Sequence, residues 1–156
     1  MNNAPAQQQL RVMIAGGGTG GHIFPAIAIA NAVREREADA EFLFVGAEGK
    51  MERAKVPAAG YRIEGLPIRG FQRGSIVKNL ALPWLLLHSM IKARRLVRSF
   101  RPQVAVGVGG YASGPLLAAA QRMGVPTLIQ EQNSFPGKTN IHLARRAQRI
   151  CVAYAG

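Results

Sequence analysis

A run of glycines that ends in a histidine is the stretch of the sequence best suited to chemistry. Residues 16–22 (GGGTGGH) follow a short apolar segment, residues 10–15, and precede a helical pattern that begins at Phe24. Glycine adds no side-chain packing, so the backbone here must turn tightly or approach a ligand closely. A glycine loop that leads into a helix gathers free backbone N–H groups and the positive end of the helix dipole around one point. We therefore predict an anion site, most often a phosphate site.

His22 stands where this loop meets the predicted helix. The helix dipole disfavours a positive charge at this end, so the neutral imidazole can accept a proton. This context favours a general base over a helix-capping or merely exposed histidine. The other two histidines, His88 in an apolar helical segment and His142 in a basic one, lack such a context and are expected to be structural.

Two further loops have unusual compositions. Residues 109–115 (GGYASGP) follow an apolar strand pattern at 104–108, and residues 130–133 (QEQN) follow another at 125–129. Ligands of open parallel sheets bind beyond the carboxyl ends of the strands, where such loops converge. We therefore expect one site formed by three loops. Two glycine loops that face each other suit a diphosphate.

Glu131 is the first acidic residue after Glu64, and it is followed by Gln132 and Asn133. On its own, such a carboxylate could cap a helix or pair with an arginine, and Asn133 could simply begin a turn. The expected convergence of this segment with the glycine loops favours a role in substrate binding.

A nicotinamide-dinucleotide site is a weaker interpretation of the first loop. Gly16, Gly18 and Gly21 have the G-x-G-x-x-G spacing, but the acid expected after the second strand has only Glu48 as a candidate. The second glycine loop is not part of that design.

Short apolar strand patterns alternate with helical patterns along the chain, which predicts the α/β class: a Rossmann-like, doubly wound parallel sheet with right-handed crossovers. Residues 1–9 are expected to be a disordered leader, and residues 10–156 one domain. The expected strands are 10–15, 41–46, 61–66, 104–108, 125–129 and 149–153, and the expected helices are 24–37, 50–59, 76–100, 116–123 and 138–147.

The composition is that of a folded protein, because 48% of the residues are apolar and 18% are charged. Cys151 is the single cysteine and lies in an apolar run, so we expect a small buried hydrophobe. A lone cysteine and the absence of a secretory-type N-terminus predict a reducing, cytoplasmic location. No cluster of metal-ligand residue types occurs, so no metal ligands are predicted.

The formal net charge of +12 calls for an anionic partner. No acidic residue occurs between Glu64 and Glu131, and that interval is rich in lysine and arginine. Nucleic acid and an anionic membrane surface both fit this charge, and composition alone does not separate them. Aromatic residues are too sparse for a platform that stacks single-stranded nucleic acid.

The predicted helix at 76–100 carries two apolar stripes. Leu82, Leu86, Ala93, Leu96 and Val97 form the stripe expected to face the sheet. Residues 80–91 include Pro83 and are shorter than the roughly 20 residues needed to span a bilayer. The second stripe is therefore interpreted as a patch that lies on an anionic membrane, although burial inside this domain or in a dimer stays open. The predicted patch consists of Ile76, Leu80, Trp84, Leu87 and Ile91 with Lys78, Lys92, Arg94 and Arg95.

Residues 17–25 (GGTGGHIFP), 109–115 and 131–133 (EQN) together resemble the N-terminal domain of the MurG family of peptidoglycan glycosyltransferases, from about Leu10 to the end of the chain. The resemblance implies the N-terminal half of an inverting hexosyltransferase of the GT-B fold, without a cofactor. The family transfers N-acetylglucosamine from UDP-GlcNAc to the C4 hydroxyl of undecaprenyl-diphosphate-muramoylpentapeptide, converting lipid I to lipid II. The resemblance also implies a peripheral location on the cytoplasmic face of the bacterial inner membrane, and a role in cell wall biogenesis, cell shape and cell division.

The resemblance also implies roles for single residues. His22 would be the catalytic base, Glu131 would support catalysis, and Asn133 would contact the donor sugar. UDP-GlcNAc would be bound mainly by a C-terminal domain absent from this chain, so the chain is expected to be inactive alone, with lipid I and the membrane as partners and no nucleic acid. A non-catalytic nucleotide- or diphosphate-binding Rossmann module is the alternative. The acceptor diphosphate would contact Gly17, Gly18, Thr19, Gly20, Gly21, Gly109, Gly110, Tyr111 and Ser113.

Overall fold

The computed structural model describes residues 9–18, 20–49, 51–70 and 79–154. Three of the predicted site residues, Thr19, Ile76 and Lys78, lie outside these ranges, as do residues 1–8 of the expected leader. Gln9, the last residue of that leader, is described, and its side-chain amide donates a hydrogen bond to the Asp39 carbonyl (2.7 Å).

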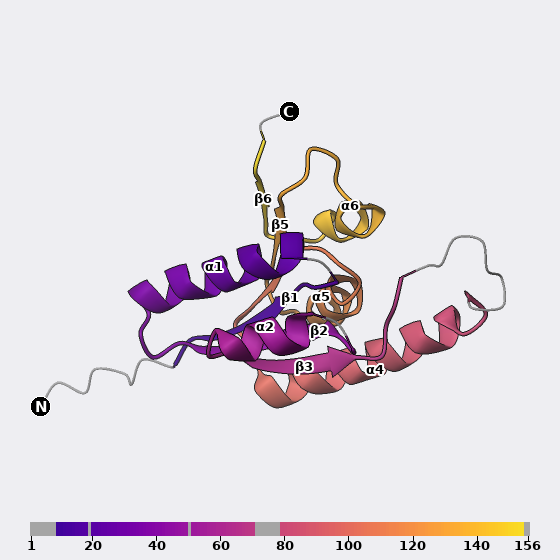
Figure 1. The fold of residues 1–156 in the computed structure, drawn as a ribbon, viewed down its shortest axis with the longest axis horizontal. Helices are drawn as coiled ribbons and strands as arrows, with labels where there is room; N and C mark the ends of the chain where they lie inside the picture. The colour runs from indigo at the N-terminus through magenta and orange to yellow at the C-terminus, as the bar shows by residue number, and fades with distance from the viewer. Residues whose placement is uncertain (1–8, 19, 50, 71–78, 155–156) are drawn as a thin grey trace, which may run out of the picture.

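Six described strands form one parallel sheet in the order β3-β2-β1-β4-β5-β6 (Figure 1). This is the strand order of a doubly wound, Rossmann-like fold, so the predicted fold class is confirmed. The order reverses between β1 and β4, which lie side by side in the centre of the sheet. The strands are β1 Arg11–Ala15, β2 Glu41–Ala47, β3 Arg62–Leu66, β4 Val104–Gly107, β5 Thr127–Glu131 and β6 Arg149–Val152.

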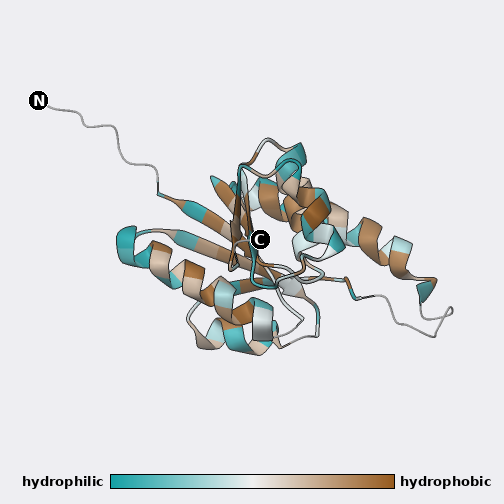
Figure 2. Cartoon of the chain, turned by 90° about the horizontal axis from the view of Figure 1, so that it is seen from above, coloured by the Kyte–Doolittle hydropathy of each residue, from teal (hydrophilic) through white to brown (hydrophobic). Residues whose placement is uncertain are grey.

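Helices cover both faces of the sheet, which appears between two helical layers in Figure 2. Strand side chains alternate between the layers, as the two-residue period of a strand requires. Val12 and Ile14 of β1 pack in the core beneath α1 and α2, whereas Met13 and Ala15 pack beneath α4, α5 and α6. The helices are α1 Gly20–Arg36, α2 Glu52–Ala58, α4 Leu82–Phe100, α5 Ser113–Arg122 and α6 Lys138–Ala144.

Two helices begin earlier than the sequence pattern predicts. α1 begins at Gly20 rather than Phe24, with Pro25 inside it, and α5 begins at Ser113 rather than Leu116. The patterns start where large apolar side chains start, whereas the helical backbone already includes small residues of the glycine loops. Both glycine loops therefore run directly into helices, and His22 lies in the first turn of α1.

Strand β5 lies two residues further along the chain than predicted, at 127–131 instead of 125–129. The N–H of Val125 closes the end of α5 by donating to the Ala120 carbonyl (2.9 Å). Thr127 is instead the first strand residue, paired with Ala105 of β4. Glu131 consequently stands at the end of a strand, in a fixed backbone, rather than in the loop.

The first half of α4 projects past the sheet in both ribbon views (Figures 1 and 2). Its buried residues are Ser89, Ala93, Val97 and Phe100, so the first seven residues of the helix include no buried one. The prediction that Leu86 faces the sheet is wrong: the residue is 49% exposed, because none of the described strands reaches that part of the helix. Leu80, Trp84, Leu87 and Ile91 are exposed as well. None of the described helices combines the length and apolar character needed to cross a bilayer.

Cys151 is exposed, so the expectation of a buried cysteine is wrong. It belongs to β6, the strand at one edge of the described sheet, and all four residues of β6 are exposed. An apolar run does not distinguish a covered strand from an uncovered edge strand.

Candidate functional site

The two glycine loops and the end of β5 meet at the carboxyl edge of the sheet, around a cavity of about 460 Å³. β1 and β4 are neighbours, so the loops that follow them are neighbours too. The cavity brings together eight of the predicted site residues, while Gly20, Gly21 and Ser113 do not line it. The eight are Gly17, Gly18, His22, Gly109, Gly110, Tyr111, Glu131 and Asn133.

The two loops approach each other so closely that only glycine fits. Gly18, Gly109 and Gly110 have φ values of 90°, 96° and 83°, in the left-handed region that favours glycine. A side chain at Gly110 would overlap the carbonyl of Gly17, and one at Gly109 would press against the His22 ring. The predicted close approach of backbone is therefore present, and it is an approach of one loop to the other.

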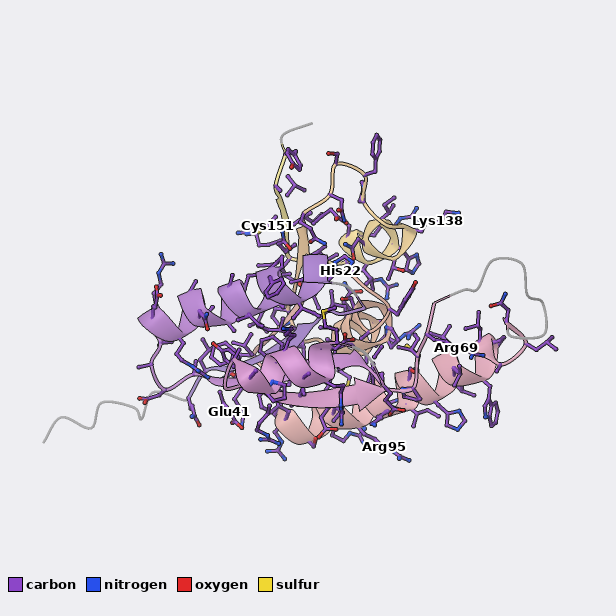
Figure 3. All side chains as sticks on the ribbon, in the orientation of Figure 1. His22, Glu41, Arg69, Arg95, Lys138 and Cys151 are labelled. Atoms are coloured by element: carbon purple, nitrogen blue, oxygen red, sulfur yellow. The ribbon has the colours of Figure 1, made fainter. Side chains whose placement is uncertain are left out.

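His22 is half-buried beside the cavity, where α1 begins, on the side of the molecule that carries β5 and α6 (Figure 3). Its Nδ1 lies 2.9 Å from the Val108 carbonyl oxygen. A carbonyl can only accept, so Nδ1 must carry the proton. In the neutral ring, Nε2 then holds the lone pair, as a general base requires.

Glu131 is buried at the end of β5, and its carboxylate accepts hydrogen bonds from backbone and side-chain groups. Its Oε1 accepts from the backbone N–H and the side-chain amide of Asn133 (3.0 and 2.9 Å), and its Oε2 from the side-chain amide of Asn140 (2.8 Å). Burial alone would raise the pKa of Glu131, but these bonds and one from the Gly137 backbone outweigh it, so the pKa is lowered. Glu131 is therefore an ionised carboxylate that orients Asn133 and is unsuited to donate a proton.

Ser113 is buried behind the cavity. Its Oγ lies 2.8 Å from the Gly109 carbonyl and 2.9 Å from the Ala15 carbonyl. The hydroxyl thus ties the second glycine loop to the end of β1.

Glu52, at the start of α2, is a site residue that the sequence reasoning missed. Its side chain is 0% exposed and lies beneath the first glycine loop. Oε1 accepts from the Ala47 N–H (2.9 Å), and Oε2 accepts from the Gly18 N–H (3.1 Å). The Gly18 N–H is therefore not free for a phosphate. The free donors are the N–H groups in the first turn of α1, which have no partner within the helix.

Two residues in the first turn of α6 were also missed. Asn140 is buried and bonds Glu131, and Thr139 lines the cavity. Their polar side chains alone do not mark them as site residues in the sequence, because many polar residues follow β5 and any of them could lie near the site.

Glu48, the candidate ribose ligand, forms an exposed ion pair with Lys92 of α4 (3.3 Å). It does not line the cavity. Within the part of the chain that the structure describes, no three His, Cys, Asp or Glu side chains gather as metal ligands would.

Comparison with known proteins agrees with this geometry. Residues 12–152 match the Glycosyltransferase family 28 N-terminal domain. A Bacteroides fragilis relative, UDP-N-acetylglucosamine–N-acetylmuramyl-(pentapeptide) pyrophosphoryl-undecaprenol N-acetylglucosamine transferase, is 63% identical over 99% of this chain and 41% of its own length. A relative of the same name from Cytophaga hutchinsonii is 57% identical over 96% of this chain and 41% of its own length. The chain thus spans about two fifths of these relatives.

Solved structures extend the comparison to the fold. The crystal structure of MurG from Acinetobacter baumannii superposes with a TM-score of 0.82 at 32% identity, over 94% of this chain and 42% of that one. A putative UDP-N-acetylglucosamine 2-epimerase from Listeria monocytogenes reaches a TM-score of 0.66 at 12% identity, over 92% of this chain and 39% of that one, which shows a shared fold alone. These matches confirm the resemblance to the MurG family. The chain belongs to glycosyltransferase family 28, of which residues 12–152 form the N-terminal domain.

Proposed function

We propose that this chain is the acceptor-binding part of an enzyme that transfers N-acetylglucosamine from UDP-GlcNAc to the C4 hydroxyl of undecaprenyl-diphosphate-muramoylpentapeptide, in peptidoglycan synthesis. The observation that carries the proposal is the cavity between two glycine loops, lined by His22, whose Nδ1 is held by the Val108 carbonyl. The names of the relatives in Bacteroides fragilis and Cytophaga hutchinsonii support the choice of substrates. The donor nucleotide would be bound mainly by residues outside these 156, so the chain by itself is expected to be inactive.

The acceptor diphosphate would lie across the edge of the sheet, between the loops that follow β1 and β4. The N–H groups in the first turns of α1 and α5, with the positive ends of both helix dipoles, would hold its charge. Tyr111, which is exposed at the rim of the cavity, would contact the bound acceptor.

His22 would take the proton from the C4 hydroxyl through Nε2. The hydroxyl oxygen then forms a bond to the anomeric carbon of the donor while the bond from that carbon to the UDP oxygen breaks, and UDP leaves with the electron pair. Attack from the face opposite the leaving group inverts the configuration. Asn133, oriented by the ionised Glu131, would contact the donor sugar.

The exposed face of α4 supports a location on the membrane. Trp84 is 65% exposed, and Leu87 and Ile91 follow it on the same face. Further along that face, Ile91, Arg94, Arg95 and Arg98 line a surface pocket. An apolar stretch that continues into arginines matches a bilayer with anionic headgroups. We propose peripheral binding to the cytoplasmic face of the bacterial inner membrane, and through the reaction a role in cell shape and division.

His22→Ala in a full-length enzyme that carries these residues tests the proposal. Loss of a general base is expected to lower kcat about 100-fold or more, measured with labelled UDP-GlcNAc and a polyprenyl-diphosphate acceptor. His142→Ala is the matched control, because His142 is exposed on α6 and does not line the cavity. Binding of pyrophosphate to the chain is expected to survive in both variants. Unchanged turnover in His22→Ala would reject His22 as the base. No turnover by the wild-type full-length enzyme, with pyrophosphate binding retained by the chain, would favour a binding module without catalysis.

A further inference from the structure

Gln132 follows β5 and reaches the His22 ring. Its side-chain Nε2 lies 2.5 Å from His22 Nδ1, the same ring nitrogen that lies 2.9 Å from the Val108 carbonyl oxygen. The Oε1 of Gln132 is buried and has no hydrogen-bond partner within the described residues. Gln132 therefore has two unexplained features. Its amide nitrogen lies close to a ring nitrogen that already has a partner, and its amide oxygen has none.

The chemistry of the three groups resolves both. The Val108 oxygen can only accept a hydrogen bond, so Nδ1 is protonated, and a protonated ring nitrogen cannot bond an amide N–H. Rotating the Gln132 amide by 180° exchanges its oxygen and nitrogen without moving other atoms, and such amide orientations follow from the hydrogen-bond network. The oxygen then faces the Nδ1–H and is no longer unpaired, and the amide nitrogen takes the position in which the oxygen had no partner.

We propose that Gln132 is a positioning residue for His22, whose Oε1 shares the Nδ1 proton with the Val108 carbonyl. The two acceptors hold the ring in one orientation and in one tautomer, so that Nε2 keeps the lone pair. The use of Nε2 as a base rests on the proposed function, but the tautomer is a property of the chain itself.

The partner is an amide rather than a carboxylate, and this affects the charge of the ring. A carboxylate at Nδ1 would favour the imidazolium, whereas a neutral amide orients the ring without doing so. The other described titratable side chains that line the cavity are Glu131 from β5 and Tyr111 from the β4–α5 loop, and Glu52 lies under the first glycine loop. None of these three is hydrogen-bonded to Nδ1 within the described residues.

Nitrogen-15 NMR of the His22 ring in this chain, followed from pH 5 to pH 9, tests the proposal. The wild type is expected to show a single neutral tautomer with the proton on Nδ1. Gln132→Met keeps the length of the side chain and removes the acceptor, so the Nε2-protonated tautomer should appear. Gln132→Glu restores an acceptor with a charge, so the tautomer should be retained and the titration midpoint should rise by about one pH unit, a tenfold change in proton affinity.

Gln103→Met is the matched control. It removes a glutamine oxygen that accepts from the Arg11 N–H (2.6 Å) at the opposite, amino edge of the sheet, and it should leave the His22 signals unchanged. A merely structural role for Gln132 would change stability without this pattern of tautomer and midpoint. Wild-type ring signals in both Gln132 variants would overturn the proposal. The readout needs no substrate, so a failed transferase assay would reject the base function separately.

Discussion

At the scale of single residues, the buried side chain of Glu52 restricts which residue types fit at neighbouring positions. A side chain at Gly17 or at Gly46 would overlap the Glu52 side chain. The carboxylate thus occupies the space that two glycines leave open, and its two backbone hydrogen bonds join the first glycine loop to the end of β2. Glycine at these two positions leaves room for an interior carboxylate, and Gly17 lines the cavity as well.

Glu52→Gln is expected to destabilise the fold by about 1–3 kcal/mol, because one of two buried N–H groups would then face an amide N–H and remain unsatisfied. Urea unfolding measures the change. Glu35→Gln, on the exposed face of α1, is the control and should stay within about 0.5 kcal/mol of the wild type. Equal stability of the two variants would show that the buried carboxylate is dispensable.

Glu131 makes stability depend on pH in the acidic range. Its pKa is lower in the folded chain than the ordinary value of about 4.3, so its stabilising contribution is complete above that value. The contribution is lost as the pH falls through the lower pKa of the folded state. Unfolding free energies of wild type and Glu131→Gln, measured between pH 7 and pH 3, should therefore converge below about pH 4. A difference that persists unchanged at pH 3 would contradict the assignment.

The sequence predicts some of these residues and not others for a physical reason. Runs of glycine are costly unless a special backbone needs them, so residues 16–22 and 109–115 stand out, and His22 with them. Glu52 and Gln132 act only because α2 packs under the first loop and β5 ends beside α1. That depends on how whole elements pack, which residue types and spacing do not contain.

At the scale of elements, the approach of the two glycine loops is open to a direct test. Gly110→Ala should weaken pyrophosphate binding to the chain at least tenfold, because the new methyl group overlaps the Gly17 carbonyl and separates the loops. Isothermal titration calorimetry measures the affinity.

Gly124→Ala is the control for Gly110→Ala. Gly124 also has a positive φ, of 75°, but no atom lies within 4 Å of its added methyl group. Both variants thus place alanine at a positive φ, but only Gly110→Ala disturbs the contact between the loops. Equal affinity in the two would show that the contact between the loops does not shape the anion site.

The exposed apolar side chains of α4 are predicted to contribute to membrane binding. Trp84→Ser combined with Leu87→Ser should lower binding of the chain to vesicles that contain anionic lipid at least tenfold, because each side chain buried in the bilayer contributes about 1.5–3 kcal/mol. Vesicle co-sedimentation measures the binding. Ile141→Ser removes an apolar side chain that is similarly exposed on α6 and should have no effect. An equal loss in the control would point to non-specific adhesion.

The order of elements is predictable from the alternation of strand and helix patterns, whereas their boundaries are less so. The start of α1 at Gly20 and the shift of β5 to 127–131 depend on hydrogen bonds of the backbone rather than on side-chain hydrophobicity. The exposure of Leu86 depends on where the sheet ends beneath α4, which the periodicity of one helix cannot show.

At the scale of the whole molecule, the candidate site and the basic surface lie in different places. The site lies at the centre of the sheet edge, where the strand order reverses, while basic residues gather on α4 at the periphery (Figure 3). Under the proposed function, a net charge of +12 would attract the molecule to an anionic membrane surface, and the projecting apolar end of α4 would contact the bilayer. The sequence predicts both the charge and the fold class, because each is a sum over many residues and tolerates errors at single positions.

The central place of β1 also has a consequence for synthesis on the ribosome. β1 is made about 90 residues before β4, which begins at Val104 and pairs with one edge of β1. Until then, a growing chain with β1, β2 and β3 exposes an unpaired edge along β1, a template for wrong pairing. Fragments that end before β4 should therefore aggregate, and the chain should need protection by chaperones until β4 has been made.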